Sequence, residues 1–225
     1  MNIVILLAAG KSQRTGRKNK VFYPIKGKPL VFYALLTFEK HPKIQKIILV
    51  TRKEYFRKIK SLIKNCGFKK IVAVIEDGKE RQDSALEGLK AAGEFGAKKG
   101  DLILFHNIAN PLVSRREISE VIGAAKNYGA ALLAQPLKDT LKKAKNNFVE
   151  KTLSRKNLWL AQTPQTIEFY LAKRAFGRAQ KDRFYGTDDV SLVERLGKKV
   201  AIVESSYKNI KATTIEDLEI IKCLL

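Results

Sequence analysis

Cysteine is scarce in this chain of 225 residues, which contains two, Cys66 and Cys223, far apart in the sequence. Neither has another cysteine or a histidine at the spacing of a zinc site, and two distant cysteines make no disulfide framework. We therefore expect both to be buried thiols. Long apolar runs are absent as well: none approaches the roughly 20 residues that a bilayer span requires, so the sequence predicts no contact with a membrane.

The apolar stretch at the start of the chain, residues 1–7, lacks the features of a signal peptide. No basic segment precedes it, and no clear cleavage site follows it. The stretch is therefore predicted to be a buried strand, and the protein is predicted to be cytoplasmic.

Acidic residues are few relative to basic ones: 22 Asp and Glu stand against 44 Lys and Arg, which gives a formal net charge of +22. An excess of this size raises nucleic acid as a partner. The basic residues are, however, spread over nearly every polar segment, and none of the usual nucleic-acid-binding motifs is present. We expect no specific nucleic-acid partner, while non-specific attraction to polyanions stays open. An anionic substrate accounts better for some of the lysines.

Apolar residues make up 45% of the chain and occur in short runs separated by amphipathic stretches. The runs are rich in β-branched residues without strict alternation, which is typical of strands buried on both faces of a parallel sheet. The predicted strands are 2–8, 46–51, 70–75, 101–106, 130–135 and 199–203. The predicted helices are 29–39, 53–65, 81–92, 115–128 and 214–225. This order predicts one α/β domain over residues 1–225, with a Rossmann-like, doubly wound, mostly parallel sheet.

Residues 136–160 break this alternation. They are polar and lysine-rich, with two short strand-like pieces around the turn sequence at residues 145–147. The segment is predicted to be a β-hairpin arm that protrudes from the sheet. Because an isolated hairpin is only marginally stable, such an arm commonly pairs with its twin, so we expect the arm to serve dimerisation and the protein to be a homodimer.

A glycine-containing loop, residues 7–20, follows the first predicted strand, where open α/β sheets bind ligands. The small residues Ala8, Ala9 and Gly10 let backbone N–H groups approach a polyanion, and basic side chains at positions 11, 14, 17, 18 and 20 can neutralise phosphate charge. The loop is neither a Walker A motif nor a dinucleotide-binding motif. Taken alone, it fits a phosphate-binding loop or a tight turn with solvated lysines.

The same loop resembles the nucleotide-binding loop of sugar- and polyol-phosphate nucleotidyltransferases. Further segments are similar, in order and spacing, to one branch, the 2-C-methyl-D-erythritol 4-phosphate cytidylyltransferase family. They are 80–84 (ERQDS), 106–111 (HNIANP), 138–142 (KDTLK), 152–155 (TLSR), 158–165 (LWLAQTPQ), 187–189 (TDD) and 209–214 (NIKATT). The resemblance covers almost the whole chain.

The resemblance implies a reaction in which a phosphate oxygen of a polyol phosphate attacks the α-phosphorus of CTP and releases pyrophosphate. In this family the product, formed with Mg²⁺ as cofactor, enters isoprenoid precursor synthesis by the non-mevalonate pathway. Two anions must meet, so the physical task is charge neutralisation and in-line positioning.

The resemblance also assigns roles at the nucleotide. Arg14 and Lys20 match the catalytic positions that stabilise the α-phosphoryl transition state. Residues 8–10 match backbone contacts to the base and triphosphate, and Arg81 and Ser84 match positions near the cytosine and ribose.

A second set of residues matches the positions that hold the polyol phosphate. Arg155 and Lys211 would clamp its phosphate from two sides, as a planar guanidinium and a point-like ammonium. Thr140 and Thr163 match neighbouring contacts. If the arm is exchanged between subunits, Arg155 and Thr140 would act in the neighbouring subunit's site.

Two positions depart from the family pattern. Asn107 stands where the family has an acidic residue that helps to hold Mg²⁺, and Asn110 stands where it has an arginine near the substrate. An amide oxygen can coordinate a hard cation, but more weakly than a carboxylate. The sequence therefore leaves open a ribitol- or other polyol-phosphate cytidylyltransferase and a catalytically weakened paralogue.

Overall fold

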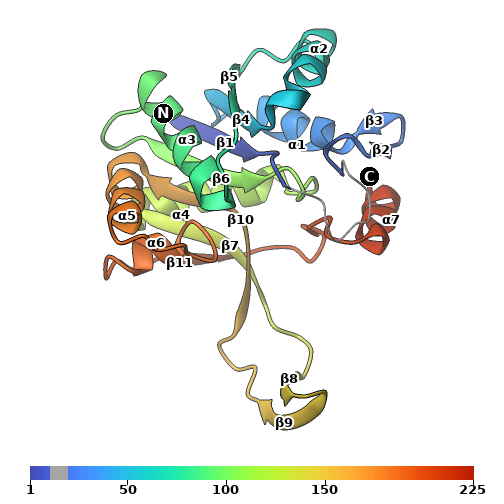
Figure 1. Ribbon diagram of the computed structural model, residues 1–225, viewed down its shortest axis with the longest axis vertical. Helices are drawn as coiled ribbons and strands as arrows, with labels where there is room; N and C mark the ends of the chain where they lie inside the picture. The colour runs from blue at the N-terminus through green and yellow to red at the C-terminus, as the bar shows by residue number, and fades with distance from the viewer. Residues whose placement is uncertain (11–19) are drawn as a thin grey trace.

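The computed structural model describes residues 1–10 and 20–225, and a seven-stranded sheet runs through their centre (Figure 1). The strand order is β11-β7-β10-β6-β1-β4-β5. The strands are β1 (Asn2–Leu7), β4 (Lys46–Thr51), β5 (Ile71–Glu76), β6 (Leu102–Asn107), β7 (Ala130–Pro136), β10 (Trp159–Glu168) and β11 (Ala201–Glu204). The expected mostly parallel α/β sheet is confirmed, because β4-β5, β1-β4, β1-β6 and β7-β11 all pair in parallel.

Strand β10 was not predicted, and it is the antiparallel element of this sheet, lying between β6 and β7. Its residues 162–166 (QTPQT) are polar or proline, so they form no apolar run. Residues 163–167 are nevertheless buried, and hydrogen bonds take up the polar side chains of Thr163 and Gln165. Burial of polar residues by such bonds leaves no periodic signal in a sequence.

Helices cover both faces of the sheet. They are α1 (Leu30–Glu39), α2 (Phe56–Cys66), α3 (Arg81–Glu94), α4 (Arg115–Tyr128), α5 (Phe169–Lys181), α6 (Ser191–Glu194) and α7 (Ile215–Leu224). Short 3-10 turns precede α1 and α2 at Lys20–Phe22 and Lys53–Tyr55, and β2 (Pro24–Ile25) pairs with β3 (Lys28–Pro29). The five predicted helices are present, with ends shifted by up to three residues. Helix α5 was missed, since its many basic residues mask a buried stripe of Phe169, Ala172, Phe176 and Ala179.

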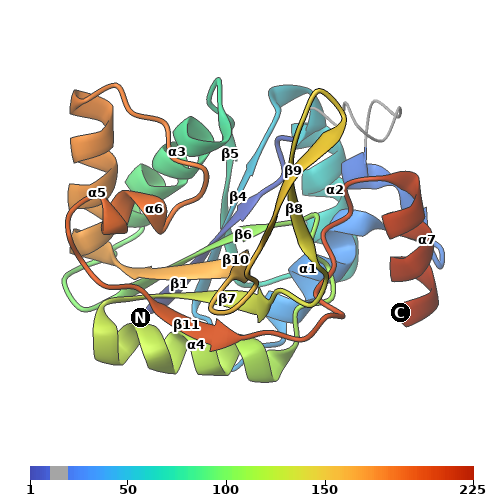
Figure 2. The same cartoon turned by 90° about the horizontal axis from the view of Figure 1, so that it is seen from below.

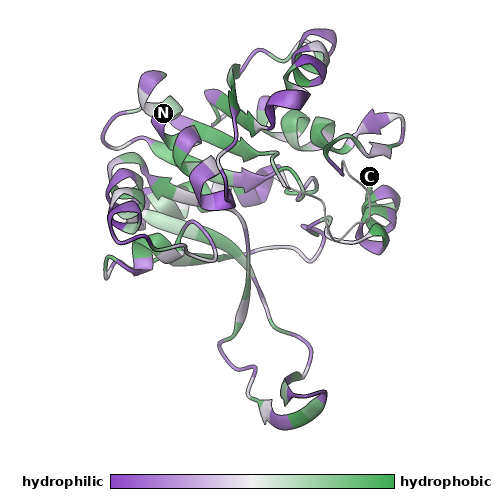
Figure 3. Cartoon of the chain, in the orientation of Figure 1, coloured by the Kyte–Doolittle hydropathy of each residue, from purple (hydrophilic) through white to green (hydrophobic). Residues whose placement is uncertain are grey.

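Two apolar layers hold these helices on the sheet, and β1, like much of the sheet, is green in Figure 3 and contributes to both layers. Val4 and Leu6 face the layer that contains α1 and α4, whereas Ile3 and Ile5 face the layer that contains α3 and α5. This alternation is the period of a strand that is buried on both sides. Figure 2 shows α1 and α4 on one face and α3, α5 and α6 on the other, which is the doubly wound arrangement.

The segment between β7 and β10 leaves the body as a long extension that ends in a hairpin of β8 (Leu141–Lys145) and β9 (Phe148–Leu153) (Figure 1). Asn146 and Asn147 occupy the turn with φ of 49° and 67°, the left-handed pair that a tight hairpin turn requires. The hairpin is exposed almost throughout. The predicted arm covered residues 136–160, but Pro136 belongs to β7 and residues 159–160 belong to β10, so the arm is residues 137–158.

The cysteines differ from expectation. Cys223 is exposed on α7 and Cys66 is only partly buried at the end of α2, so the prediction of two buried thiols is wrong. Both thiols are free. Among residues 1–10 and 20–225, no helix combines the length and apolar character needed to cross a membrane.

Candidate functional site

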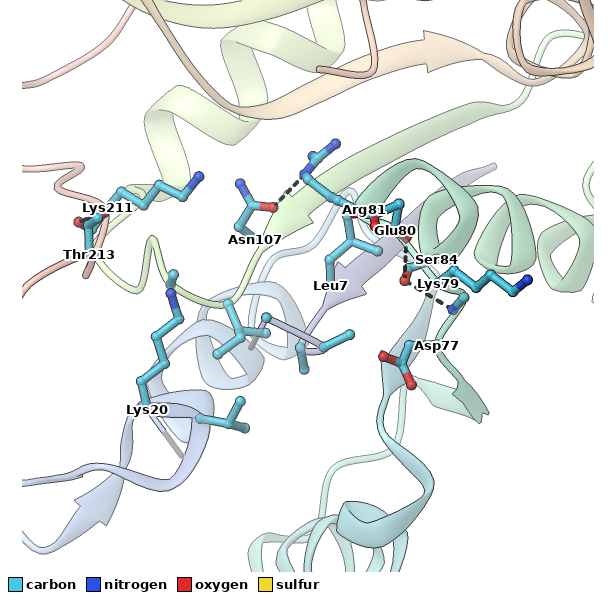
Figure 4. Close-up of a pocket in the computed structure, with 17 residues that line it drawn as sticks. Leu7, Lys20, Asp77, Lys79, Glu80, Arg81, Ser84, Asn107, Lys211 and Thr213 are labelled. Carbon is cyan, nitrogen blue, oxygen red and sulfur yellow. Dashed lines mark hydrogen bonds between the residues drawn. The ribbon is translucent and has the colours of Figure 1, made fainter. Parts of the chain in front are cut away.

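A cavity of about 520 Å³ opens where β1 and β6 end and α3 begins. Figure 4 shows its labelled side chains: Lys20 and Lys211 lie on one side, Arg81 and Ser84 on the other, and Asn107 between them. Because β1 and β6 are parallel neighbours, their carboxyl ends meet at one edge of the sheet, and the loops that follow them form the floor of the cavity.

Lys20 reaches the cavity from the turn after the glycine-containing loop. Its ammonium donates a hydrogen bond to the carbonyl oxygen of Ala212 at 3.3 Å, which fixes the cation beside the segment that carries Lys211. Gly10 lies against it: a Cβ atom at Gly10 would be 3.6 Å from Lys20 Cε. Ala8, Ala9 and Gly10 line the cavity. Arg14, the other predicted catalytic residue, lies outside the described residues.

The start of α3 forms the opposite wall. Ser84 Oγ donates to the carbonyl oxygen of Glu80 at 3.1 Å and accepts a hydrogen bond from the amide of Gly78 at 3.1 Å. The Asp83 carboxylate accepts from the amide of Glu80 at 3.0 Å, so it caps the helix. Gly78 has no room for a side chain, since a Cβ atom there would lie 2.4 Å from Asp83 Cβ. The Ser84 hydroxyl therefore shapes the wall that the sequence assigned to nucleotide binding.

Arg81 is the first residue of α3 and is locked in place. Its Nη1 and Nη2 atoms donate to the two carboxylate oxygens of Asp189 at 3.0 and 2.6 Å, and its Nε donates to Asn107 Oδ1 at 3.1 Å. Asp189 is 1% exposed. The Gln165 Oε1 atom accepts from the backbone amides of Asp189 and Val190, so it holds the loop that carries this carboxylate.

The charge state of Arg81 follows from these contacts. Burial alone would lower the pKa of the guanidinium, but the adjacent Asp189 carboxylate outweighs burial, and the pKa is raised. Arg81 is therefore a permanent cation whose charge is already balanced by a buried partner. Lys20 and Lys211 lie across the cavity from it.

Behind Asn107 lies a buried polar chain around His106. The His106 Nε2 atom is 2.9 Å from the Asn110 carbonyl oxygen, which can only accept, so Nε2 carries the proton. His106 Nδ1 then accepts a hydrogen bond from the Thr163 hydroxyl at 3.0 Å. That hydroxyl in turn accepts one from the backbone N–H of Asn107 at 3.4 Å. Complete burial is the main cause that lowers the pKa of His106 to about 4.

Two residues that the resemblance placed near the polyol phosphate, Thr163 and Asn110, make hydrogen bonds inside the protein and do not line the cavity. Thr163 is buried, and its hydroxyl is used by His106 and Asn107. Asn110 is 3% exposed and donates from Nδ2 to the carbonyl oxygen of Asn209 at 3.1 Å. Neither residue lines the cavity. The Asn110 amide is therefore used within the protein.

The arm residues are not brought to the cavity within one chain. Thr140 and Arg155 are exposed on the arm, and neither lines the cavity that contains Lys211. The Arg155 guanidinium donates to the carbonyl oxygen of Lys138, so it contacts the arm itself. Within this chain, the arm residue Arg155 is thus not brought to the cavity that Lys211 lines.

The sequence assigned no role to Asp189, Gln165 or His106, although the segments that contain them belong to the resemblance. The pairing of Asp189 with Arg81 cannot be predicted from spacing, because the two residues are 108 positions apart in the sequence. The sequence does contain one signal that could have pointed to Asp189, namely two adjacent acidic residues at 188–189 in a strongly basic chain.

Comparisons with known proteins find relatives that match almost the whole chain. The sequence model of the family described as 2-C-methyl-D-erythritol 4-phosphate cytidylyltransferase matches residues 2–225. Proteins of that name from Bacillus licheniformis and Geobacillus kaustophilus are 39% and 40% identical to this chain, over 99% and 98% of it and 94% and 95% of their own lengths.

Solved structures are similar over the same extent. The 4-diphosphocytidyl-2C-methyl-D-erythritol synthase of Anaerococcus prevotii superposes with a TM-score of 0.86 at 27% identity, covering 100% of this chain and 97% of its own. The 2-C-methyl-D-erythritol 4-phosphate cytidylyltransferase of Francisella tularensis gives a TM-score of 0.84 at 31% identity, with 100% and 99% coverage.

Proposed function

This chain belongs to the 2-C-methyl-D-erythritol 4-phosphate cytidylyltransferase family, and we infer that it is a nucleotidyltransferase that transfers the cytidylyl group of CTP to 2-C-methyl-D-erythritol 4-phosphate in isoprenoid precursor synthesis. The observation that carries this function is the cavity at the ends of β1 and β6, where Lys20 and Lys211 extend toward the space between them. A site that must bring two anions together needs such cations.

In this reaction, a phosphate oxygen of the polyol phosphate forms a bond to the α-phosphorus of CTP, and the bond from the α-phosphorus to the bridging oxygen of pyrophosphate breaks. No covalent enzyme intermediate is needed. We propose that Lys20, together with Arg14, stabilises the charge that develops on the α-phosphoryl oxygens. The hydrogen bond from Lys20 to Ala212 supports this role, since a cation held in advance costs no reorganisation during the reaction.

We propose that the nucleotide lies between β1 and α3, with residues 8–10 and Ser84 beside it and the polyol phosphate near Lys211. Residues 8–10, Ser84 and Lys211 all line the cavity, which supports this orientation. Arg81 borders the nucleotide end, but its contacts to Asp189 and Asn107 use its Nε and one hydrogen on each terminal nitrogen. We assign it to holding this wall in place.

Mg²⁺ is proposed to arrive with the triphosphate of CTP. The described residues do not fit a metal site built by the protein: they contain no group of three His, Cys, Asp or Glu side chains that could hold an ion. The Asn107 oxygen already accepts from Arg81. Since Mg²⁺ commonly binds substrate phosphates and water with few protein ligands, we assign it no ligand from these residues.

We propose that the enzyme is a homodimer in which each arm completes the other subunit's site. Two features support this proposal. Thr140 and Arg155 lie on the arm, away from the cavity that contains Lys211, and Phe148 and Val149 at the arm tip are 79% and 61% exposed. Apolar side chains of this size on a hairpin are stabilised when a second surface covers them.

Subunit mixing tests the exchange of arms. Arg155→Ala and Lys211→Ala should each lower activity strongly in homodimers. A dimer mixed from both variants should regain one intact site, with Arg155 from one chain and Lys211 from the other. Activity that recovers on mixing, measured together with mass by light scattering, supports the proposal. An absence of recovery in confirmed mixed dimers contradicts it.

Pyrophosphate release from CTP, measured across a panel of polyol phosphates, tests the function itself. We expect the fastest release with 2-C-methyl-D-erythritol 4-phosphate. Preference for ribitol phosphate would identify the alternative polyol-phosphate cytidylyltransferase, for which the neutral Asn110 is the motivating feature. No release with any polyol phosphate, while CTP still binds in calorimetry, would identify a catalytically weakened paralogue.

We further propose that the enzyme works in the cytoplasm, where CTP is made, and its two free cysteines suit a reducing compartment. The net charge of +22 supports weak, salt-sensitive attraction to polyanions as a side effect.

A further inference from the structure

The orientation of the Asn107 amide is determined by its neighbour. Asn107 ends β6 and lines the cavity, and its Oδ1 atom is 3.1 Å from Arg81 Nε. Because an arginine Nε–H can only donate, the amide must turn its oxygen toward Arg81. The NH₂ group therefore points away from Arg81, as the blue nitrogen of Asn107 does in Figure 4.

Arg81 cannot easily turn away and release this amide. Both of its terminal nitrogens are held by the buried Asp189 carboxylate, and Gln165 holds the backbone of Asp189. The backbone of Asn107 is anchored as well, through its amide to the Thr163 hydroxyl. The side chain of Asn107 is thus positioned by Arg81 in the cavity wall, and its backbone by Thr163, which does not line the cavity.

The charge balance around Arg81 favours an amide over a carboxylate at this position. Arg81 is already paired one-to-one with Asp189. A carboxylate at position 107 would add a second negative charge beside Arg81, in a cavity that must accept two anions. An amide keeps the acceptor that Arg81 needs and adds a hydrogen-bond donor without that repulsion.

We propose that Asn107 is a substrate-positioning residue that donates a hydrogen bond from Nδ2 to an anionic phosphate oxygen where the two substrates meet, and that it is not a ligand of Mg²⁺. Its place between Lys211 on one side and Arg81 with Ser84 on the other puts the donor at that junction. The proposal rests on the proposed function and adds to it the role of this residue.

Two variants test the role of Asn107. Asn107→Asp keeps the acceptor for Arg81 and removes the donor, whereas Asn107→Leu removes both without adding charge. Calorimetry with CTP alone and with 2-C-methyl-D-erythritol 4-phosphate alone, each in EDTA, should show that at least one affinity falls roughly tenfold or more in both variants, with Asp the weaker binder. Thermal denaturation confirms that each variant is folded.

The matched control makes the same change at an exposed site. Asn65→Asp, on α2 and away from the cavity, should leave both affinities within about twofold. The donor proposal also expects that Asn107→Asp does not lower the Mg²⁺ concentration for half-maximal CTP binding. A lower Mg²⁺ requirement in Asn107→Asp, or unchanged metal-free affinities in both variants, would overturn it.

Failure of the proposal can be told apart from failure of the proposed function. If the unaltered protein releases no pyrophosphate with any polyol phosphate, but both Asn107 variants bind CTP more weakly in EDTA, the function is wrong and the donor assignment stands. If the unaltered protein is active and the variants bind both substrates normally, the donor assignment is wrong and the function stands.

Discussion

The basic side chains of the cavity and those of the arm differ in their surroundings: the first contact the body of the protein, and the second lie on an exposed hairpin. In the cavity, Arg81 is tied to the buried Asp189, and Lys20 is held by a backbone carbonyl. On the arm, Lys142 and Lys143 contact Thr152 and Glu150 on the exposed hairpin surface. The basic side chains of the cavity are thus positioned before any ligand binds, whereas those of the arm contact only other residues of the arm.

The two regions also differ in how much their polar contacts contribute to the free energy of folding. Hydrogen bonds around His106 and Asp189 lie in a buried environment, where each is strengthened and each loss leaves a costly unpaired group. Ion pairs on the arm are solvated and contribute roughly 0–1 kcal/mol each. We therefore expect substitutions in the body of the protein to change catalysis or stability, and substitutions at the exposed tip of the arm to change assembly.

The largest effect is expected at Lys20. Lys20→Ala should lower kcat by roughly 10²- to 10³-fold, since one positioned charge-stabilising group is lost, and it should change CTP affinity much less. Steady-state kinetics and calorimetry measure the two effects. Lys60→Ala, at an exposed position on α2, is the control and should keep full activity. Full turnover of Lys20→Ala, where chemistry limits the rate, would remove Lys20 from this role.

Acid should destabilise the body through His106. Its pKa is lowered to about 4 in the folded protein, from 6.5, so the unfolded state binds the proton more readily. Stability is therefore lost as the pH falls from 6.5 toward 4, by an amount on the order of 3 kcal/mol for this group. Denaturant unfolding at several pH values measures the loss.

The chain has two histidines, so imidazole NMR resonances can report each one separately. We expect the resonance of His106 to titrate near pH 4, and that of His41, whose pKa burial also lowers, to titrate below its ordinary value. A His106 resonance that titrates near 6.5 would show that burial and the hydrogen bonds to Asn110 and Thr163 do not keep the imidazole ring neutral.

A smaller effect is expected in the packing behind the cavity. Gly88 of α3 touches β1, and a Cβ atom there would lie 2.4 Å from Ile5 Cγ2 and 3.2 Å from Val50 Cγ2. Gly88→Ala should lower the free energy of unfolding by about 1–3 kcal/mol through overpacking. Gly123→Ala in α4, where a Cβ atom meets nothing within 4 Å, should raise it by roughly 0.5–1 kcal/mol. Equal effects of the two changes would contradict this account.

The smallest effect on the fold is expected at the arm tip. Phe148→Ser should change the free energy of unfolding of the body by no more than about 0.5 kcal/mol, because the side chain is 79% exposed. It should, however, weaken the proposed dimer, which sedimentation over a dilution series measures. Tyr128→Ser, on α4 and 68% exposed, is the control and should leave assembly unchanged. A dimer that is unaffected by Phe148→Ser would place the interface elsewhere.

Most elements of the fold could be predicted because their signals are local. The β-branched runs at β1, β4 and β6 and the apolar periods of α1 and α4 need no knowledge of distant residues. Strand β10 and helix α5 were missed for the opposite reason. Polar residues of β10 are buried by contacts with distant segments, and basic residues hide the apolar stripe of α5.

The site divides in the same way. By itself, the sequence determined the fold class, the family, and the position of Lys20, Ser84, Asn107 and Lys211 near one edge of the sheet, since short motifs that follow parallel strands must gather there. Only the tertiary structure decided that Asp189 binds Arg81, that Asn107 turns its oxygen to Arg81, and that Arg155 lies apart from Lys211. These three results depend on pairs of residues separated by long stretches of chain, whose contacts are set by packing and the balance of buried charge.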